Sequence, residues 1–197
     1  MVELKKLVLA TGNQNKVNEI KAKLQEQKLS IEIIQVKQPF DVEETGKTFS
    51  ENAYIKAFTA AKIMNLPTLA DDSGLCIDAL NGDPGIYSSR YEETTEKRIE
   101  KVLKNLKNVP PQKRTAHFIC ALAVVSPEGD LLFSTEGKCE GIIIDETKGD
   151  LGFGYDPIFY IPDLNKTMAE LSMDEKNKVS HRSDALNKFV LWLGELK

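Results

Sequence analysis

The sequence predicts a compact globular domain that contains both strands and helices. The chain has 197 residues, which is long enough for one domain with a substantial core. Hydrophobic residues make up 41% of the chain and charged residues 28%, an ordinary balance for a globular enzyme or binding domain. The chain also opens with an apolar run, a polar loop and a helical pattern. We therefore expect residues 1–197 to form a single domain.

The first half of the chain alternates apolar runs with helical patterns. In the first helical pattern, Val17, Ile20 and Leu24 recur at the spacing of one helix face. At the start of the second helical pattern, Thr48 and Glu51 match the capping box. The expected elements are a strand at Leu4 to Ala10, a helix at Lys16 to Lys28, a short apolar run at Ile31 to Val36 and a helix from about Phe49 to Met64.

The second half begins with two short apolar pieces on either side of an Asp-Asp-Ser-Gly turn. Later elements are separated by segments rich in glycine and proline. The expected elements are strand pieces at Thr68 to Ala70 and Leu75 to Ile77, a loop at Asn81 to Tyr91, a helix at Glu96 to Leu106, a hairpin of Ala116 to Val125 with Leu131 to Thr135, a strand at Cys139 to Asp145 and a helix from about Ser183 to Leu196.

Charge and composition narrow the function classes. A formal net charge of −4 argues against broad nucleic-acid binding, which needs an extended basic surface, so any phosphate site must be a local pocket. The apolar segment Leu7 to Ala10 is far too short for a signal sequence or a membrane span, and we expect a cytoplasmic protein. Cys76, Cys120 and Cys139 have neither CxxC spacing nor nearby histidine pairs, so we expect buried thiols.

Two adjacent carboxylates, Asp71 and Asp72, end an apolar run immediately before Ser73 and Gly74. Magnesium prefers oxygen ligands and usually takes one or two protein carboxylates, while phosphates and water supply the rest. Two neighbouring acids would also repel each other unless a cation or donors compensated. The pattern predicts a magnesium site, and a turn that uses Asp72 as an Asx acceptor is the structural alternative. Because side chains alternate along a strand, one of the two acids is expected to point away.

The segment TGNQNK, from Thr11 to Lys16, lies between the first strand and the first helix. Backbone N–H groups and the helix dipole favour an anion at such a place. Thr11 and Asn13 can donate further hydrogen bonds, and Lys16 adds a positive charge. A phosphate site is therefore expected, the alternative being that Asn13 or Asn15 only caps the helix. The spacing matches neither a P-loop nor GxGxxG.

Two further groups of residues complete the candidate site. Glu44, in an acidic loop, can join Asp71 and Asp72, with Lys56 on the following helix as a nearby cation; solvated surface acids are the alternative. The segment Gly152 to Asp156 places glycines on both sides of Phe153, whose ring could stack on a base with about 1–3 kcal/mol. A tight turn with core aromatics is the alternative there. Further donors for a purine and its sugar are expected at Lys176, Ser180, His181 and Arg182, although His181 alone would suit a polar helix start.

Four blocks, LATGNQNK, EETGKTFSENAYIKA, LADDSGL with GDPGIYSSRY, and GFGYDPIF with SHR, resemble the inosine triphosphate pyrophosphatase family, which acts on non-canonical purine nucleoside triphosphates. The resemblance extends from residue 8 to residue 186. It implies an α/β fold with a long central mixed sheet flanked by helices, two lobes with an active-site cleft between them, magnesium dependence and a homodimer. Leu151 stands where the family commonly has glycine, which bears on substrate range rather than on reaction type.

The resemblance also implies roles for single residues. Glu44 and Asp72 would bind magnesium, and Asp71 would be a further ligand or a support for them. Asp72 would accept a proton, while Lys56 and Ser73 would contact phosphates. The remaining implied substrate contacts are Thr11, Gly12, Asn13 and Lys16 for the triphosphate, and Phe153, Gly154, Tyr155, Asp156, Lys176, His181 and Arg182 for the base and sugar.

The expected reaction is hydrolysis of ITP, dITP or XTP between the α and β phosphates, which gives a nucleoside monophosphate and pyrophosphate. Magnesium would neutralise phosphate charge and lower the pKa of a bound water, and Lys16 and Lys56 would stabilise the departing pyrophosphate. Donors directed at O6 would favour 6-oxo purines over adenine. GTP shares the 6-oxo group, so it must be rejected at position 2 of the base.

Three other interpretations fit the sequence less well. A haloacid dehalogenase phosphatase would need DxDx[TV] spacing, which is missing. A Maf-like nucleotide pyrophosphatase with another base preference is disfavoured by the SHR and GFGYDP blocks. A non-catalytic nucleotide-binding module is disfavoured by the three candidate carboxylates, Glu44, Asp71 and Asp72.

Overall fold

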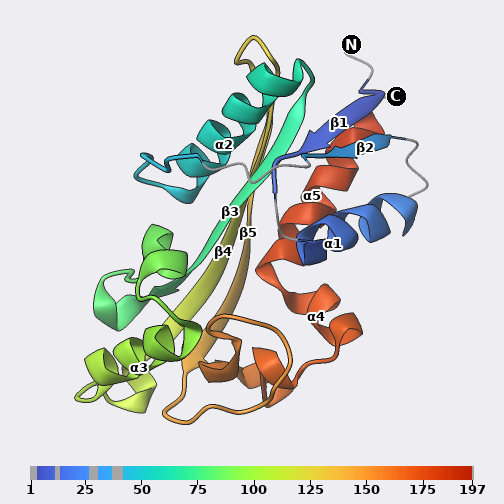
Figure 1. Ribbon diagram of the computed structural model, residues 1–197. Coiled ribbons are helices and arrows are strands. Elements are labelled where there is room, and N and C mark those ends of the chain that lie inside the picture. Colours follow the sequence, from blue (N-terminus) through green and yellow to red (C-terminus); the bar gives the residue numbers. More distant parts are fainter. Residues whose placement is uncertain (1–3, 12–13, 27–30, 37–41, 197) are drawn as a thin grey trace. The chain divides into compact units, whose positions relative to one another are not determined.

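A computed structural model describes residues 4–11, 14–26, 31–36 and 42–196 (Figure 1). Its strands form one sheet in the order β2-β1-β3-β4-β5-β6-β7. β1 pairs in parallel with β2 and with β3, whereas β6 pairs antiparallel with β5 and β7, so the sheet is mixed. The expected α/β class with a mixed sheet flanked by helices is confirmed.

The elements follow one another along the chain as strands and helices of very different length. The strands are β1 (Lys6–Leu9), β2 (Glu32–Gln35), β3 (Thr68–Ile77), β4 (Thr115–Val125), β5 (Leu131–Ile143), β6 (Phe159–Ile161) and β7 (Lys166–Thr167). The helices are α1 (Gln14–Glu26), α2 (Phe49–Met64), α3 (Thr95–Leu106), α4 (Met173–Val179) and α5 (His181–Glu195).

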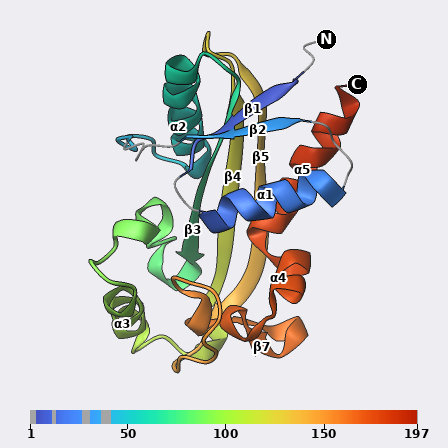
Figure 2. The ribbon, with the colours of Figure 1, turned by 45° about the vertical axis from the view of Figure 1, so that its right-hand side comes forward.

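The chain divides into two compact units, of which the first comprises Met1–Asp72, Cys120–Gly137 and Asp184–Lys197. In this unit α1 and α5 lie on one side of the strands and α2 on the other (Figures 1 and 2). Buried residues of α1 and α5, among them Val17 and Phe189, share one apolar core with buried residues of β1 and β4, among them Leu7 and Leu122. The buried face of α2 is made mostly of small residues, namely Ala53, Ala57, Ala60 and Ala61.

The second unit comprises Ser73–Ile119 and Lys138–Ser183. Its core joins the end of β3 to α3, β6 and neighbouring segments, with Leu75, Val102 and Leu106 fully buried. The rings of Phe118 and Phe159 pack with centroids 4.5 Å apart. Each unit therefore has its own apolar core.

Several expected elements are confirmed. α1, α2, α3 and α5 lie where the helical patterns were found, and the thiols of Cys76, Cys120 and Cys139 are buried and free. Thr48 caps α2, since its hydroxyl accepts from the Glu51 N–H at 3.1 Å. The carboxylate of Glu51 accepts from the Lys47 N–H at 2.6 Å.

Other expectations are wrong. The turn at residues 71–74 is absent, because β3 runs unbroken from Thr68 to Ile77. The strand at Cys139 to Asp145 is not separate but belongs to β5, a strand of 13 residues. β6, β7 and α4 were not expected, because three, two and seven residues are too short to give a clear periodic pattern.

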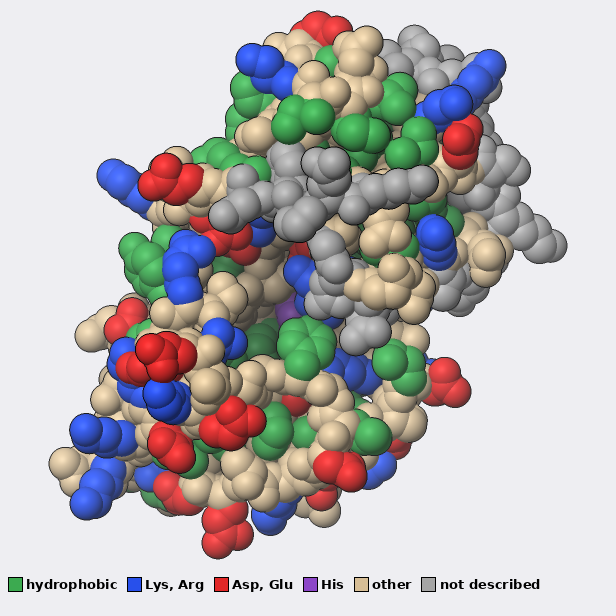
Figure 3. All heavy atoms as spheres, viewed as in Figure 1, with side chains coloured by type: hydrophobic (Ala, Val, Ile, Leu, Met, Phe, Trp, Pro, Cys, Tyr) green, Lys and Arg blue, Asp and Glu red, His purple; other side chains and the backbone are tan. Residues whose placement is uncertain are grey.

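The described surface carries charges of both signs. Figure 3 shows acidic and basic side chains interspersed on the face drawn, so that face has no extended basic surface. Within the described residues, no helix has the length and apolar character that crossing a membrane requires.

Candidate active site

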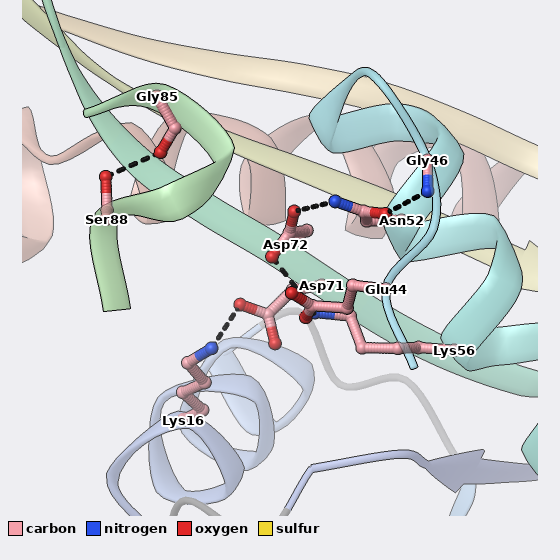
Figure 4. A network of polar contacts seen from close by, with 9 residues as sticks. All are labelled: Lys16, Glu44, Gly46, Asn52, Lys56, Asp71, Asp72, Gly85 and Ser88. Atoms are coloured by element: carbon pink, nitrogen blue, oxygen red, sulfur yellow. Dashed lines mark hydrogen bonds and ion pairs between the residues drawn. The ribbon is translucent and has the colours of Figure 1, made fainter. Parts of the chain in front are cut away.

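Asp71 and Asp72 point toward different helices of the first unit (Figure 4). Asp71 Oδ2 accepts from Lys16 Nζ on α1 at 2.6 Å, whereas Asp72 meets side chains of α2. This follows from β3, because successive side chains of an extended strand face opposite ways. Each acid therefore pairs with a different lysine, so two adjacent acids can be accommodated in one continuous strand.

Helix α2 holds Asp72 with two side chains one helical turn apart. Asn52 Nδ2 donates to Asp72 Oδ2 at 3.2 Å, and Lys56 Nζ donates to Asp72 Oδ1 at 3.0 Å. Lys56 Nζ also donates to Glu44 Oε1 at 2.8 Å, so one ammonium joins two carboxylates. The Gly46 N–H donates to Asn52 Oδ1 at 2.9 Å and ties the loop that carries Glu44 to the helix (Figure 4).

The protonation of this network is shifted by its surroundings. Burial raises the pKa of Asp72, which is 7% exposed; the positive charge of Lys56 opposes that rise, and the charge of Glu44 adds to it. Burial would lower the pKa of Lys56, but the charges of Asp72 and Glu44 outweigh it and raise that pKa. The ammonium of Lys56 therefore stays charged, while Asp72 becomes a stronger proton acceptor than an exposed aspartate.

The expected phosphate segment is described only in part. Thr11 is half-buried two residues after the end of β1, and Lys16 lies in the first turn of α1, where it pairs with Asp71. The structure therefore brings Lys16 to the carboxylates. Gly12 and Asn13 lie outside the described residues.

The second unit contains a pocket of about 150 Å³ that gathers most of the residues expected to bind base and sugar. The expected residues in its lining are Ser73, Phe153, Gly154, Tyr155, Asp156, Lys176, His181 and Arg182. Its other lining residues are Gly74, Leu75, Ser88, Ser89, Arg98 and Phe118. Segments far apart in the sequence thus meet at one concave surface.

Asp156 organises one side of this pocket. It is 3% exposed, and its Oδ2 accepts from Lys176 Nζ at 2.5 Å and from the Phe153 N–H at 2.9 Å. Phe153 is 51% exposed, and Lys176 Nζ and the Arg182 guanidinium carbon lie 5.1 Å and 5.8 Å from the centroid of its ring. A partly exposed ring backed by two cations suits a flat, electron-rich ligand.

The start of α5 and a buried serine form other parts of the lining. The His181 ring stacks on Phe118 with centroids 4.9 Å apart, and α5 begins at His181. His181 and Arg182 therefore belong to the helix itself. The Tyr155 hydroxyl donates to the Ser88 carbonyl at 2.9 Å, and the Ser88 hydroxyl accepts from the Leu75 N–H at 2.9 Å.

Comparison with known proteins identifies the family. The family model described as the Ham1 family matches residues 7–192. The chain belongs to the Ham1 family. Its similarity to dITP/XTP pyrophosphatases covers almost the whole chain, with 49% identity to that of Halalkalibacterium halodurans over 96% of this chain and 100% of the relative. The Bacillus subtilis dITP/XTP pyrophosphatase is 48% identical over 95% of this chain and 96% of its own.

Solved structures of Ham1 proteins agree with the fold. The Staphylococcus aureus Ham1 protein matches with a TM-score of 0.88 and 43% identity, covering 98% of this chain and 100% of its own. The Coxiella burnetii HAM1 protein matches with a TM-score of 0.90 and 45% identity, over 96% and 98% of the two chains. The family resemblance inferred from the motifs is confirmed.

In this Ham1 protein the carboxylates around Lys56 have the chemistry that magnesium requires. Glu44 and Asp72 are hard oxygen donors that already converge on one cation. The described residues contain no group of three His, Cys, Asp or Glu side chains that could hold a metal, so two carboxylates would leave most of the coordination shell to phosphates and water. Asp71, turned toward Lys16, stays a predicted ligand or support.

Two residues of the site were missed in the sequence. Asn52 is fully buried in α2, and a buried amide in a helix among alanines is costly unless it is hydrogen-bonded, which is a signal that could have revealed its role. Arg98 lines the pocket from α3, but an arginine on an otherwise charged helix face gives no signal in the sequence.

Proposed function

We propose that the protein hydrolyses non-canonical purine nucleoside triphosphates such as dITP and XTP to the nucleoside monophosphate and pyrophosphate. The observation that carries the proposal is the buried Asp72 network, in which Asp72 and Glu44 share the ammonium of Lys56, in a chain 46–49% identical to dITP/XTP pyrophosphatases. None of the structural findings favours a Maf-like enzyme or a non-catalytic module.

In this proposal the residues around Asp72 bind the triphosphate and perform the chemistry. Asp72 accepts the proton of the attacking water, a role that its raised pKa supports and that is typically worth about 10²- to 10⁴-fold in rate. Lys16 and Lys56 stabilise the negative charge of the pyrophosphate as it leaves. Thr11, Gly12 and Asn13 contribute donors to the phosphates, and Ser73 follows Asp72 directly on β3 as a further phosphate contact.

Magnesium is the proposed cofactor, held by Glu44 and Asp72 with Asp71 as ligand or support. When bound, it neutralises phosphate charge and lowers the pKa of a coordinated water. The side chain of Asn52 keeps Asp72 in place for this, because it occupies the carboxylate oxygen that Lys56 does not. The loop bond from Gly46 to Asn52 keeps Glu44 close to the same point.

The proposed base and sugar site is the pocket of the second unit. Phe153, with Gly154 beside it, supplies a face for the base, and Tyr155 and Asp156 shape the turn behind it. Lys176, His181 and Arg182 supply donors for O6 and N7 of a 6-oxo purine. An adenine amino group would leave these donors unpaired, which costs roughly 1–3 kcal/mol.

The test is pyrophosphate release from ITP, dITP, XTP, GTP and ATP, with and without magnesium. We expect release from the first three, dependent on magnesium, and a loss of about 10²-fold or more in kcat for Asp72→Asn. Glu44→Gln should weaken the response to magnesium, whereas Glu43→Gln, at the exposed neighbouring residue, should leave that response unchanged. No release from any nucleotide, or near wild-type turnover of Asp72→Asn, would refute the proposal.

We further propose that the enzyme works as a homodimer in the cytoplasm and that residues 1–197 behave as one domain. The continuous strands β3, β4 and β5 support the last point, because each of them contributes residues to both units. Light scattering would measure the mass in solution, and a single calorimetric transition is expected on heating.

A further inference from the structure

The pocket of the second unit is lined by positively charged side chains from three different elements. Lys176 comes from α4, Arg182 from α5 and Arg98 from α3. The one carboxylate in the lining, Asp156, already accepts from Lys176 and from the Phe153 N–H. The charged side chains of the lining therefore offer a ligand mainly hydrogen-bond donors, which favours oxo groups over amino groups.

Two of the three cations lie close to the Phe153 ring. Lys176 Nζ lies 5.1 Å and the Arg182 guanidinium carbon 5.8 Å from the centroid of the Phe153 ring. Arg98 and Tyr155 both line the pocket, and the charge of Arg98 opposes the rise that burial causes in the pKa of Tyr155. The pocket thus offers a ligand cationic donors from α4 and α5 beside Phe153, and a further one from α3.

Arg98 is held so that most of its donors stay available. Its side chain is half-buried, and its Nε donates to the Glu92 carbonyl at 2.8 Å. Within the described part of the chain this is the side chain's only hydrogen bond, so the two terminal nitrogens of this pocket-lining residue keep their donors for another partner. Anchoring through Nε fixes the plane of the guanidinium and so gives its remaining donors a direction.

We propose that Arg98 determines specificity at position 2 of the purine, where it donates to the 2-oxo group of xanthine and disfavours the 2-amino group of guanine. This inference rests on the proposed function, in which Lys176, His181 and Arg182 read O6 and N7. Hypoxanthine, xanthine and guanine share the 6-oxo group and differ at position 2, which carries hydrogen, oxygen and an amino group respectively. A guanidinium facing an amino group leaves two donors opposed, and such mismatches at polar sites discriminate strongly.

The experiment compares kcat/KM for XTP, ITP and GTP in the wild type, Arg98→Gln and Arg98→Lys. Lys104→Gln is the matched control, because Lys104 is an exposed cation on the same helix and outside the pocket lining. For Arg98→Gln we expect the XTP-to-ITP ratio to fall roughly tenfold and the XTP-to-GTP ratio to fall at least as much. Arg98→Lys keeps the charge but loses the planar fork, so its two ratios should lie between those of the wild type and Arg98→Gln. Lys104→Gln should leave both ratios unchanged.

The ratios distinguish recognition from a structural role. Loss of the bond to the Glu92 carbonyl could lower stability and reduce activity on all three nucleotides together, which would overturn the inference. If Arg98→Gln does not fold, Arg98→Lys decides the question, and an unchanged XTP-to-ITP ratio in it would overturn the inference as well. Failure of the wild type to release pyrophosphate from ITP would instead refute the proposed function itself.

Discussion

Substitution of Gly152 by alanine should destabilise the protein far more than backbone strain alone predicts. Gly152 has a φ of +82°, and a Cβ there would lie 2.2 Å from Asp156 Oδ2 and 3.0 Å from Lys176 Nζ. The left-handed backbone costs an alanine about 1–2 kcal/mol. The Asp156 carboxylate must also move, which disturbs its bonds to Lys176 and to the Phe153 N–H.

The magnitude follows from the burial of that ion pair. Removing one partner of a buried pair costs about 3–5 kcal/mol, and a displaced rather than deleted Asp156 should cost about 2–3 kcal/mol of that. For a chain of this size each kcal/mol shifts Tm by about 2–4 °C. Together with the strain, we expect Gly152→Ala to lower Tm by roughly 6–20 °C and to raise KM for the nucleotide, because Asp156 and Phe153 line the pocket.

Gly82→Ala is the control for strain. Gly82 has a φ of +91°, and no atom lies within 4 Å of the position of its Cβ, so alanine meets only the backbone cost there. Urea unfolding and calorimetry of both variants should give a difference of about 2–3 kcal/mol. Equal losses of stability in the two variants would refute the argument that Gly152 is required by Asp156.

Three other predictions concern single side chains. Asn52→Ala should cost about 1–3 kcal/mol in urea unfolding and lower kcat, because it leaves one oxygen of buried Asp72 without its donor. Hydrogen bonds from Lys166 and from Ser172 lower the pKa of Glu175 to about 2, so its contribution to stability is present above its usual pKa near 4.5 and is lost as pH falls toward 2; Glu175→Gln should flatten that part of a Tm-against-pH curve. Burial raises the pKa of Cys139 to about 11, so native protein at pH 8 should react with a thiol reagent at this site only after unfolding.

Local signals in the sequence predicted the longer elements well. The helix from Phe49 to Met64 was placed at its observed bounds, because a capping threonine and a run of apolar residues at helical spacing agreed. The buried face of α5, with Leu186, Phe189, Val190 and Leu193, follows from the same periodicity. A helix cap and the periodicity of a helix face depend on residues close together in the sequence, so both can be recognised from the sequence alone.

The errors arose where distant segments decide the conformation. Asp71 to Gly74 has turn-forming residues, yet it is extended, and the two acids are neutralised by Lys56 of the preceding helix and by Lys16, which lies 55 residues before Asp71. The roles of Asn52 and Arg98 likewise depend on which segments pack beside them. Candidate residues could be named from the sequence because their types are chemically distinctive, whereas their contact partners could be identified only in three dimensions.

Lys56 gives the fold an internal counter-ion. Its ammonium lies within 3.0 Å of both Asp72 and Glu44, so two acids that would repel each other are already neutralised in part by the chain itself. Many metal sites leave their folding dependent on the supply of the ion. With the proposed magnesium site, the chain can assemble its acidic centre before the ion binds, so chelators should abolish turnover and leave the melting temperature nearly unchanged.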